Sequence, residues 1–152
     1  MPSPNLETDL DPPVSSRTGG ARRMRSLLLV DDEPNVLSAL RRHFRAHYTI
    51  HEAASGTLAL AVLETEPIDA IITDMRMPVM NGAELLRRVS LRWPSMVRIL
   101  LTGYSDLKVT TDAIREGLID HYLTKPWEPQ EITDCLDRAL STRFRADRRG
   151  VK

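Results

Sequence analysis

The sequence predicts a doubly wound α/β fold, in which helices cover both faces of a parallel sheet. Strand-like and helix-like segments alternate five times between residues 26 and 144. Several of the strand-like segments are continuous apolar runs, which is typical of strands that are covered on both faces. The connections are short, as expected of a sheet built from right-handed strand–helix–strand crossovers.

The first half of this region supplies three strands and two helices. Residues 26–30 (SLLLV) and 68–73 (IDAIIT) are apolar runs, and residues 48–53 (YTIHEA) form a short β-prone segment. Residues 34–47 and 55–66 carry their apolar side chains at helical spacing. Each apolar stripe therefore predicts a helix that packs on the sheet.

The second half repeats the pattern. Two further strands are expected at residues 97–102 (VRILLT) and 120–124 (DHYLT). Three further helices are expected at residues 82–93, 105–117 and 128–144. We expect Ser105 or Asp106 to cap the second of these helices and Gly117 to end it.

The two ends of the chain differ from this folded region, which we place at residues 25–143. Residues 1–24 are rich in Pro, Ser, Gly and charge without apolar periodicity, so we expect a disordered extension. Residues 144–152 form a basic C-terminal tail, which we expect to fray from the last helix. A solvated tail is a better reading of its arginines than a nucleic-acid contact.

Composition argues for a single soluble domain. The chain has 152 residues, and its 21 basic side chains balance its 21 acidic ones, so the total charge favours neither a nucleic-acid partner nor a membrane surface. The single cysteine, Cys135, cannot form an internal disulfide, which fits a reducing cytoplasm. We find neither a membrane-spanning apolar run nor a signal peptide and expect a cytoplasmic protein.

Polar side chains gather where the predicted strands end. Asp31 and Asp32 follow the first strand, and Asp74 follows the third. Thr102 ends the fourth strand, and Lys125 follows the fifth. Ligands of open parallel sheets bind beyond the carboxyl ends of the strands, so these side chains meet at one edge if the first and third strands are neighbours.

Such a group suits phosphoryl chemistry. Carboxylates about 4 Å apart repel each other by roughly 4 kcal/mol at an effective dielectric constant of about 20, and a divalent cation removes that repulsion. Mg²⁺ prefers a few carboxylates together with waters and phosphate oxygens. Lys125 and Thr102 could bind the oxygens of a phosphoryl group carried by Asp74, which makes Asp74 a candidate nucleophile.

Each residue also has a simpler reading. The stretch DDEP at 31–34 could merely cap a helix, with Pro34 in its first turn. Asp74 could be a loop acid, Thr102 a turn residue and Lys125 a solvated lysine. Their shared position at strand ends on one edge favours the functional interpretation.

Four stretches carry a resemblance to a known family: LLLVDDEPNVL, IITDMRMPVMNG, ILLTGYSD and HYLTKPWEP. In order and spacing they resemble the receiver domain of two-component response regulators, the family of the bacterial chemotaxis response regulator, over about residues 26–142. LLTGYSD and HYLTKPW are most similar to receivers joined to HD-type cyclic-dinucleotide phosphodiesterases or to hydrogenase-type activators. The chain is then a stand-alone receiver or a fragment of a longer regulator.

The resemblance implies a flavodoxin-like (βα)5 sheet with strand order 2-1-3-4-5. It implies that Asp74 accepts a phosphoryl group from a sensor histidine kinase or a phosphotransfer protein. Asp32 and Asp74 would ligate Mg²⁺, or Mn²⁺ in its place, directly, and Asp31 would act mainly through water. The backbone carbonyl of Arg76 would be the third protein ligand, and Thr102 and Lys125 would bind the phosphoryl oxygens.

The same resemblance implies how the signal leaves the site. Tyr122 matches a switch aromatic that turns inward when Thr102 moves toward the phosphate. The last two helices would then change their binding of an unknown downstream protein. A homodimer through these helices is a further option. A cis peptide is expected between Lys125 and Pro126. Arg76 and Tyr104 occupy positions that tune the lifetime of the phosphoryl group.

Two other functions share this architecture. A hydrolase could use Asp74 as a nucleophile on small phosphoesters, but it would need a general acid, and Arg76 stands where a second aspartate would be expected. A flavin-binding module would need hydroxyl-rich phosphate loops, whereas acids follow the first strand here. We therefore expect a signalling switch that is not an enzyme.

Overall fold

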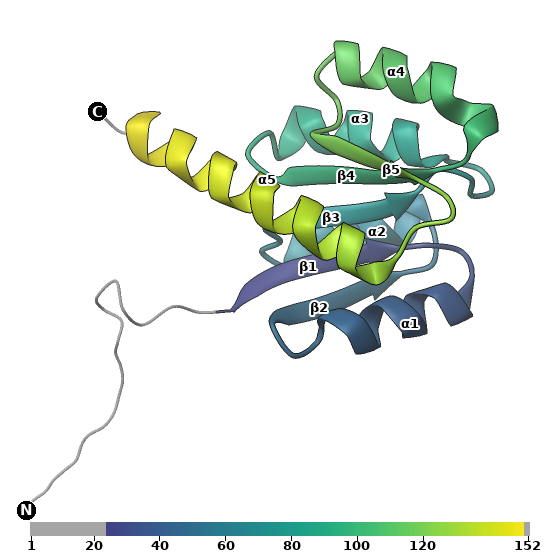
Figure 1. Cartoon of the computed structure of the whole chain (residues 1–152), viewed down its shortest axis with the longest axis horizontal. Helices are drawn as coiled ribbons and strands as arrows, with labels where there is room; N and C mark the ends of the chain where they lie inside the picture. Colours follow the sequence, from purple (N-terminus) through teal and green to yellow (C-terminus); the bar gives the residue numbers. More distant parts are fainter. Residues whose placement is uncertain (1–23, 151–152) are drawn as a thin grey trace, which may run out of the picture.

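The computed structural model describes residues 24–150, with side chains described as far as residue 143. Most of the predicted disordered extension, residues 1–23, lies outside the described residues. The described part is a parallel sheet with strand order β2-β1-β3-β4-β5, which confirms the predicted fold and strand order (Figure 1). The strands are β1 Arg25–Val30, β2 Tyr48–Ala53, β3 Ala70–Asp74, β4 Val97–Thr102 and β5 His121–Thr124.

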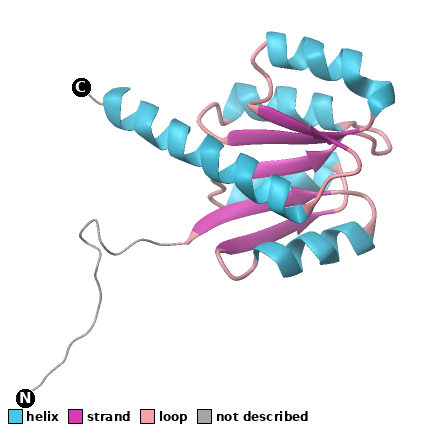
Figure 2. Ribbon diagram, in the orientation of Figure 1, coloured by secondary structure: helices cyan, strands magenta, loops and turns pink. Residues whose placement is uncertain are grey.

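Helices cover both faces of this sheet (Figure 2). They are α1 Pro34–Phe44, α2 Gly56–Thr65, α3 Gly82–Arg92, α4 Leu107–Arg115 and α5 Pro129–Gly150, with a short 3-10 turn, η1, at Tyr104–Asp106. None of the helices within residues 24–150 combines the length and apolar character that a bilayer crossing requires.

Alternation along the buried strands creates two cores. Leu27 and Leu29 of β1 pack in the core that contains α1 and α5, whereas Leu28 and Val30 pack in the core beneath α2, α3 and α4. The side chains of these four β1 residues are at most 2% exposed. A strand covered in this way must be apolar at every position, as the sequence of β1 is.

Helix ends follow the local sequence in most places. Asn81 and Glu84 form a reciprocal capping box at the start of α3. Gly117 has φ +78° and ends α4, with the Leu118 amide donating to the Ala113 carbonyl, as predicted for a glycine in the left-handed region. The cap expected at the start of α4 is wrong, because Asp106 lies at the N-cap position but makes no side-chain capping bond.

Helix α5 is longer than predicted. We expected it to end at residue 144, where the apolar periodicity stops, but it continues to Gly150. Residues 144–149 (FRADRR) include three arginines and one alanine, which are good helix formers, and Gly150 is the first helix-breaking residue after them. The predicted start of the basic tail, residue 144, therefore lies inside α5.

Candidate functional site

The strand register brings the predicted side chains to one edge. Val30 of β1 pairs with Thr73 of β3, so Asp31 and Asp74 follow neighbouring positions. Asp74 in turn pairs with Leu101 of β4, one residue before Thr102. The exits of β1, β3 and β4 are therefore adjacent, as the predicted site requires.

Three carboxylates converge at this edge. One oxygen each from Asp31, Asp32 and Asp74 lies within 4.8 Å of the others. Asp31 and Asp74 are buried, whereas Asp32 is exposed, so the cluster opens to solvent on one side. A divalent cation fits this donor set, because hard oxygen ligands in close approach need positive charge between them.

Asp31 has an unusual environment. Burial raises the pKa of its carboxyl to about 6, and the negative charges of Asp74 and Asp32 act in the same direction. The Glu33 amide, which donates to Asp31 Oδ1 at 2.9 Å, and the Lys125 charge act in the opposite direction. Glu33 itself is the N-cap residue of α1 without a capping bond, so DDEP both begins a helix and builds the acidic site.

Lys125 places a positive charge against Asp74. Its Nζ lies 2.6 Å from Asp74 Oδ1, and that oxygen accepts no hydrogen bond of normal geometry. The Lys125 amide donates to the Thr102 carbonyl at 2.8 Å, which fixes the start of the lysine loop against β4. The peptide between Lys125 and Pro126 is cis, as the resemblance implied.

The same edge forms an open pocket of about 470 Å³. It is lined by Asp31, Asp32, Glu33, Val36, Asp74, Arg76, Lys125, Pro126 and Trp127. The pocket combines negative carboxylates, one ammonium group and access from solvent. A small anion can therefore reach Asp74 when a cation offsets the repulsion from the carboxylates.

Thr102 is buried beside this pocket, and its hydroxyl is directed elsewhere. It donates to the Gly103 carbonyl and accepts a hydrogen bond from Thr110 of α4, each at 3.3 Å. Tyr122 is 40% exposed on β5, and Tyr104 is 74% exposed. The expected inward turn of Tyr122 stays a prediction.

The loop after Asp74 is folded tightly against the site. The Gly82 amide donates to the Met75 carbonyl at 2.8 Å, and the Met75 amide donates to Leu101. A Cβ atom on Gly82 would lie 2.4 Å from the Asp74 carbonyl oxygen. Gly82 is thus the residue that lets α3 begin directly beneath the end of β3.

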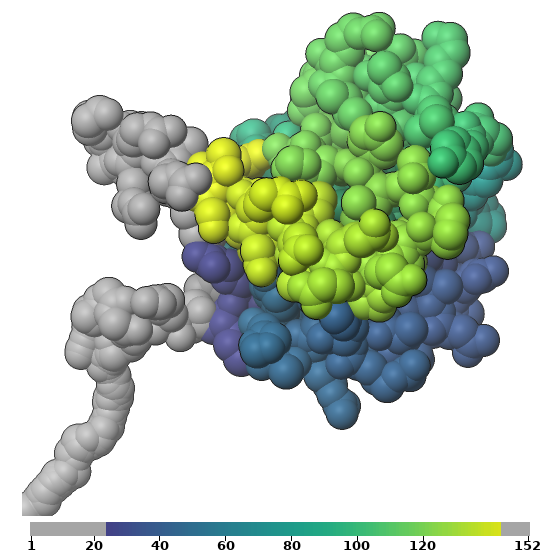
Figure 3. Space-filling view, in the orientation of Figure 1, coloured from purple at the N-terminus to yellow at the C-terminus, as the bar shows by residue number. Residues whose placement is uncertain are grey.

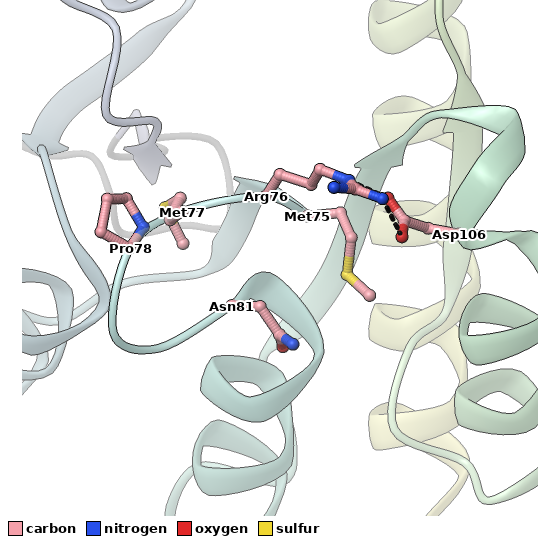
Figure 4. A pocket seen from close by; sticks show the side chains of 6 residues that line it. All are labelled: Met75, Arg76, Met77, Pro78, Asn81 and Asp106. Carbon is pink, nitrogen blue, oxygen red and sulfur yellow. Dashed lines mark hydrogen bonds and ion pairs between the residues drawn. The ribbon is translucent and has the colours of Figure 1, made fainter.

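Arg76 crosses from this loop to η1. Its Nε lies 2.9 Å from Asp106 Oδ2 (Figure 4). Its Nη2 lies 3.1 Å from the Ser105 hydroxyl. The Asp106 carboxylate raises the pKa of the Arg76 guanidinium. Arg76 and Asp106 line a second open pocket, of about 540 Å³, so Arg76 borders both pockets. The role of the Arg76 carbonyl as a metal ligand stays a prediction.

Sequence reasoning missed two residues of this arrangement. Asp106 was expected to cap α4, and its pairing with Arg76 joins residues 30 positions apart, which no local pattern reveals. Thr110 was not singled out at all. It lies three residues before buried Ala113 on the same face of α4, and that spacing is the signal that could have placed it toward the core.

The sequence matches the response regulator receiver domain over residues 27–137. This chain belongs to that family. Receivers are signalling switches rather than enzymes, they accept phosphoryl groups from histidine kinases or phosphotransfer proteins, and they bind Mg²⁺ at an acidic cluster. The hydrolase and flavin-binding alternatives are therefore set aside.

Individual relatives agree with this membership. The chain is 35% identical over 118 residues to the hydrogenase transcriptional regulatory protein HoxA of Cupriavidus necator, matching 78% of this chain and 24% of that protein. The receiver chain thus spans about a quarter of the length of the curated relatives it matches.

Solved structures of receiver domains are also similar to this chain. The signal receiver domain of an HD domain-containing protein from Pseudomonas fluorescens Pf-5 is 40% identical, with a TM-score of 0.75 over 80% of this chain and 98% of that one. A CheY-like receiver from Methanospirillum hungatei is 26% identical, with a TM-score of 0.77 over 82% and 99%. The likeness of the receiver motifs to HD-type and hydrogenase-type regulators is confirmed.

Proposed function

We propose that Asp74 of this receiver is the phosphoacceptor, charged by a phosphohistidine of a sensor histidine kinase or a phosphotransfer protein. The observation that carries the proposal is the position of Asp74 Oδ1. This oxygen is 2.6 Å from Lys125 Nζ and belongs to a cluster of three carboxylates that opens to solvent. A carboxylate in this setting is reachable, is held in one orientation and has a cation beside it.

The transfer step follows from this arrangement. A carboxylate oxygen of Asp74 attacks the phosphorus, the new O–P bond forms as the P–N bond breaks, and the electron pair returns to the imidazole nitrogen. Lys125 then pairs with a phosphoryl oxygen instead of with Asp74 Oδ1. Charge that develops on the phosphoryl oxygens is stabilised by this ammonium group without any change of its own charge.

The acidic cluster supplies the metal ligands in this proposal. Asp32 and Asp74 would hold Mg²⁺ directly, Asp31 would act through water, and the Arg76 backbone carbonyl would complete the protein ligands, with Mn²⁺ as an alternative ion. When bound, the ion neutralises the negative charge that the carboxylates and the phosphoryl group bring together. Without the ion, the ammonium group of Lys125 balances the negative charge of Asp74.

Incubation of the full chain with acetyl phosphate and Mg²⁺, followed by intact mass spectrometry, tests the assignment. We expect addition of one phosphoryl group that hydroxylamine removes, and its loss in Asp74→Asn. The matched control is Asp134→Asn, which alters an exposed carboxylate of α5 and should label like the wild type. An adduct that persists in Asp74→Asn would contradict the proposal.

The output surface of this proposal is formed by α4, β5 and α5, which form a continuous band on one side of the molecule (Figure 3). Three partly exposed apolar side chains support it: Val109 and Ile114 on α4 and Tyr122 on β5. Movement of Thr102 and Tyr122 on phosphorylation changes the affinity of this surface for a downstream protein or a second copy of the chain. Light scattering with and without beryllofluoride, a phosphoryl mimic, measures whether the chain dimerises. It therefore distinguishes a second copy of the chain from a different downstream protein.

The remaining assignments are parts of the same proposal. We place the receiver at residues 25–143, between an N-terminal extension and a basic C-terminal segment, in a cytoplasmic protein without direct nucleic-acid contacts. The balanced charge of the chain supports the last point. Retention of the chain by duplex DNA at physiological salt would contradict it.

A further inference from the structure

Two buried threonines link the phosphoryl site to α4. Thr102 ends β4 and is 0% exposed, and Thr110 lies on α4 and is 1% exposed. The Thr110 hydroxyl donates to Thr102 Oγ1 at 3.3 Å, and the Thr102 hydroxyl donates to the Gly103 carbonyl at the same distance. The Thr102 hydroxyl is therefore engaged on the α4 side and not at Asp74.

This arrangement cannot persist when Thr102 serves a phosphoryl group. A hydroxyl has one proton to donate, so Thr102 must leave the Gly103 carbonyl before it can donate to a phosphoryl oxygen. Moving toward Asp74 on β3 also takes Thr102 Oγ1 away from Thr110 on α4. Both bonds are longer than the usual 2.7–2.8 Å of hydroxyl–oxygen contacts, so each is weak enough to be exchanged.

We propose that Thr110 is a positioning residue, which holds the Thr102 hydroxyl in its unphosphorylated orientation and releases it when Asp74 is phosphorylated. The inference rests on the proposed function of Asp74 and Thr102, and it assigns to α4 a direct part in the equilibrium of the switch. Because the Thr110 bond exists only in the unphosphorylated state, removing it shifts the equilibrium toward the phosphorylated conformation.

Beryllofluoride titrations of the full chain in Mg²⁺ test this inference. Trp127 lines the pocket that contains Asp74, so its fluorescence reports binding when Trp93, the other tryptophan, is replaced by Phe in every protein compared. In Thr110→Val, which keeps the shape but not the hydroxyl, we expect about two- to fivefold tighter binding, the lower part of the range for a lost hydrogen bond. Thr110→Ser keeps the hydroxyl and should bind like the parent protein.

The outcomes separate the inference from the function on which it rests. Thr110→Val that binds beryllofluoride no more tightly than the parent would overturn the role of Thr110 alone. A parent protein that binds no beryllofluoride, or binds it equally well as Asp74→Asn, would overturn the proposed function. Urea unfolding of each variant measures packing separately, since a purely structural role changes the unfolding midpoint and leaves the affinity ratio at one.

Discussion

Arg76 Nε lies 2.9 Å from Asp106 Oδ2, so the residue two positions after Asp74 is tied to the turn that precedes α4. The Arg76 side chain is 71% exposed and Asp106 is 14% exposed. Ion pairs with an exposed partner contribute little to folding. Arg76 lines the pocket that contains Asp74 as well as the second pocket, so we expect the pair to affect access to Asp74 more than stability.

Replacing Arg76 by alanine should shorten the life of the phosphoryl group. Arg76 lines the pocket that contains Asp74, so we expect its truncation to let water reach the acyl phosphate more easily. We expect a several-fold shorter half-life after labelling with radioactive acetyl phosphate, with little change in the urea midpoint.

Asp106→Asn is the matched control for Arg76→Ala. It removes the charge of the pair but leaves Arg76 and its Ser105 contact in place, so the half-life should fall between those of the wild type and Arg76→Ala. A half-life in Arg76→Ala equal to or longer than that of the wild type would rule out the shielding role.

Gly82→Ala should disturb the site through the backbone. The added Cβ would lie 2.4 Å from the Asp74 carbonyl oxygen and 2.8 Å from a methyl carbon of Leu100. Because the first clash is with backbone, β3 or α3 must move, and overpacking of this kind costs about 1–3 kcal/mol. Urea unfolding should show this loss, together with weaker labelling of Asp74.

Gly103→Ala provides the comparison for Gly82→Ala. A Cβ atom at Gly103 meets nothing within 4 Å, and this glycine also lies next to a site residue, Thr102. Its stability and labelling should match those of the wild type. Equal behaviour of the two alanine variants would show that the approach of Gly82 to Asp74 is not tight in solution.

The sequence predicted the parts of the site that depend on local order. Apolar runs placed the strands, and parallel strands must end at one edge, so the convergence of Asp31, Asp74 and Lys125 followed from the fold class. Register adds what the pattern lacks, because Asp74 pairs with Leu101 and brings Thr102 next to it.

The missed features depend on how loops and α4 are placed in space. The Arg76–Asp106 pair and the Thr102–Thr110 contact each join a loop or strand end to the α4 region. A periodic pattern shows that Thr110 faces the core, but not which β4 residue it meets. Likewise, nothing local shows that Gly82 lies against a backbone oxygen.

Arg98→Met should weaken the fold at the opposite end of the sheet. Arg98 is a buried arginine of β4 whose Nε donates to the Leu118 carbonyl at 2.8 Å and whose Nη2 donates to Gly117. Burial lowers the pKa of its guanidinium, so the charge itself is costly. Loss of the donors leaves carbonyls unsatisfied, and we expect a net loss of about 2 kcal/mol in urea unfolding.

Arg92→Met serves as the control for Arg98→Met. Arg92 is an exposed residue of α3 that pairs with Glu64, and its replacement should leave the urea midpoint unchanged. A stable Arg98→Met protein would mean that removing a buried charge compensates fully for the lost hydrogen bonds. The hydrogen bonds that Arg143 donates to the Met96 carbonyl and to Asp120 would then be sufficient to stabilise this end of the sheet.

Asp31→Asn should make the metal-free protein more stable at neutral pH. Burial raises the pKa of Asp31 to about 6 from 3.8, so the folded state binds this proton more tightly than the unfolded state does. The contribution of Asp31 to stability is therefore complete below about pH 3.8 and is lost as the pH rises through about 6. At about 1.36 kcal/mol per pKa unit, the cost of the ionised form at pH 7.5 is at most about 3 kcal/mol.

Urea unfolding in EDTA at pH 4.5 and 7.5 measures this effect. Asparagine keeps the oxygen that accepts from the Glu33 amide, so the variant should exceed the wild type in stability at pH 7.5 and differ less at pH 4.5. Mg²⁺ should reverse the order at pH 7.5, because the variant has one carboxylate fewer near the ion and binds it more weakly, so the ion stabilises the wild type more. A wild type as stable as Asp31→Asn in EDTA at pH 7.5 would show that the cluster carries no unfavourable charge for a metal ion to relieve.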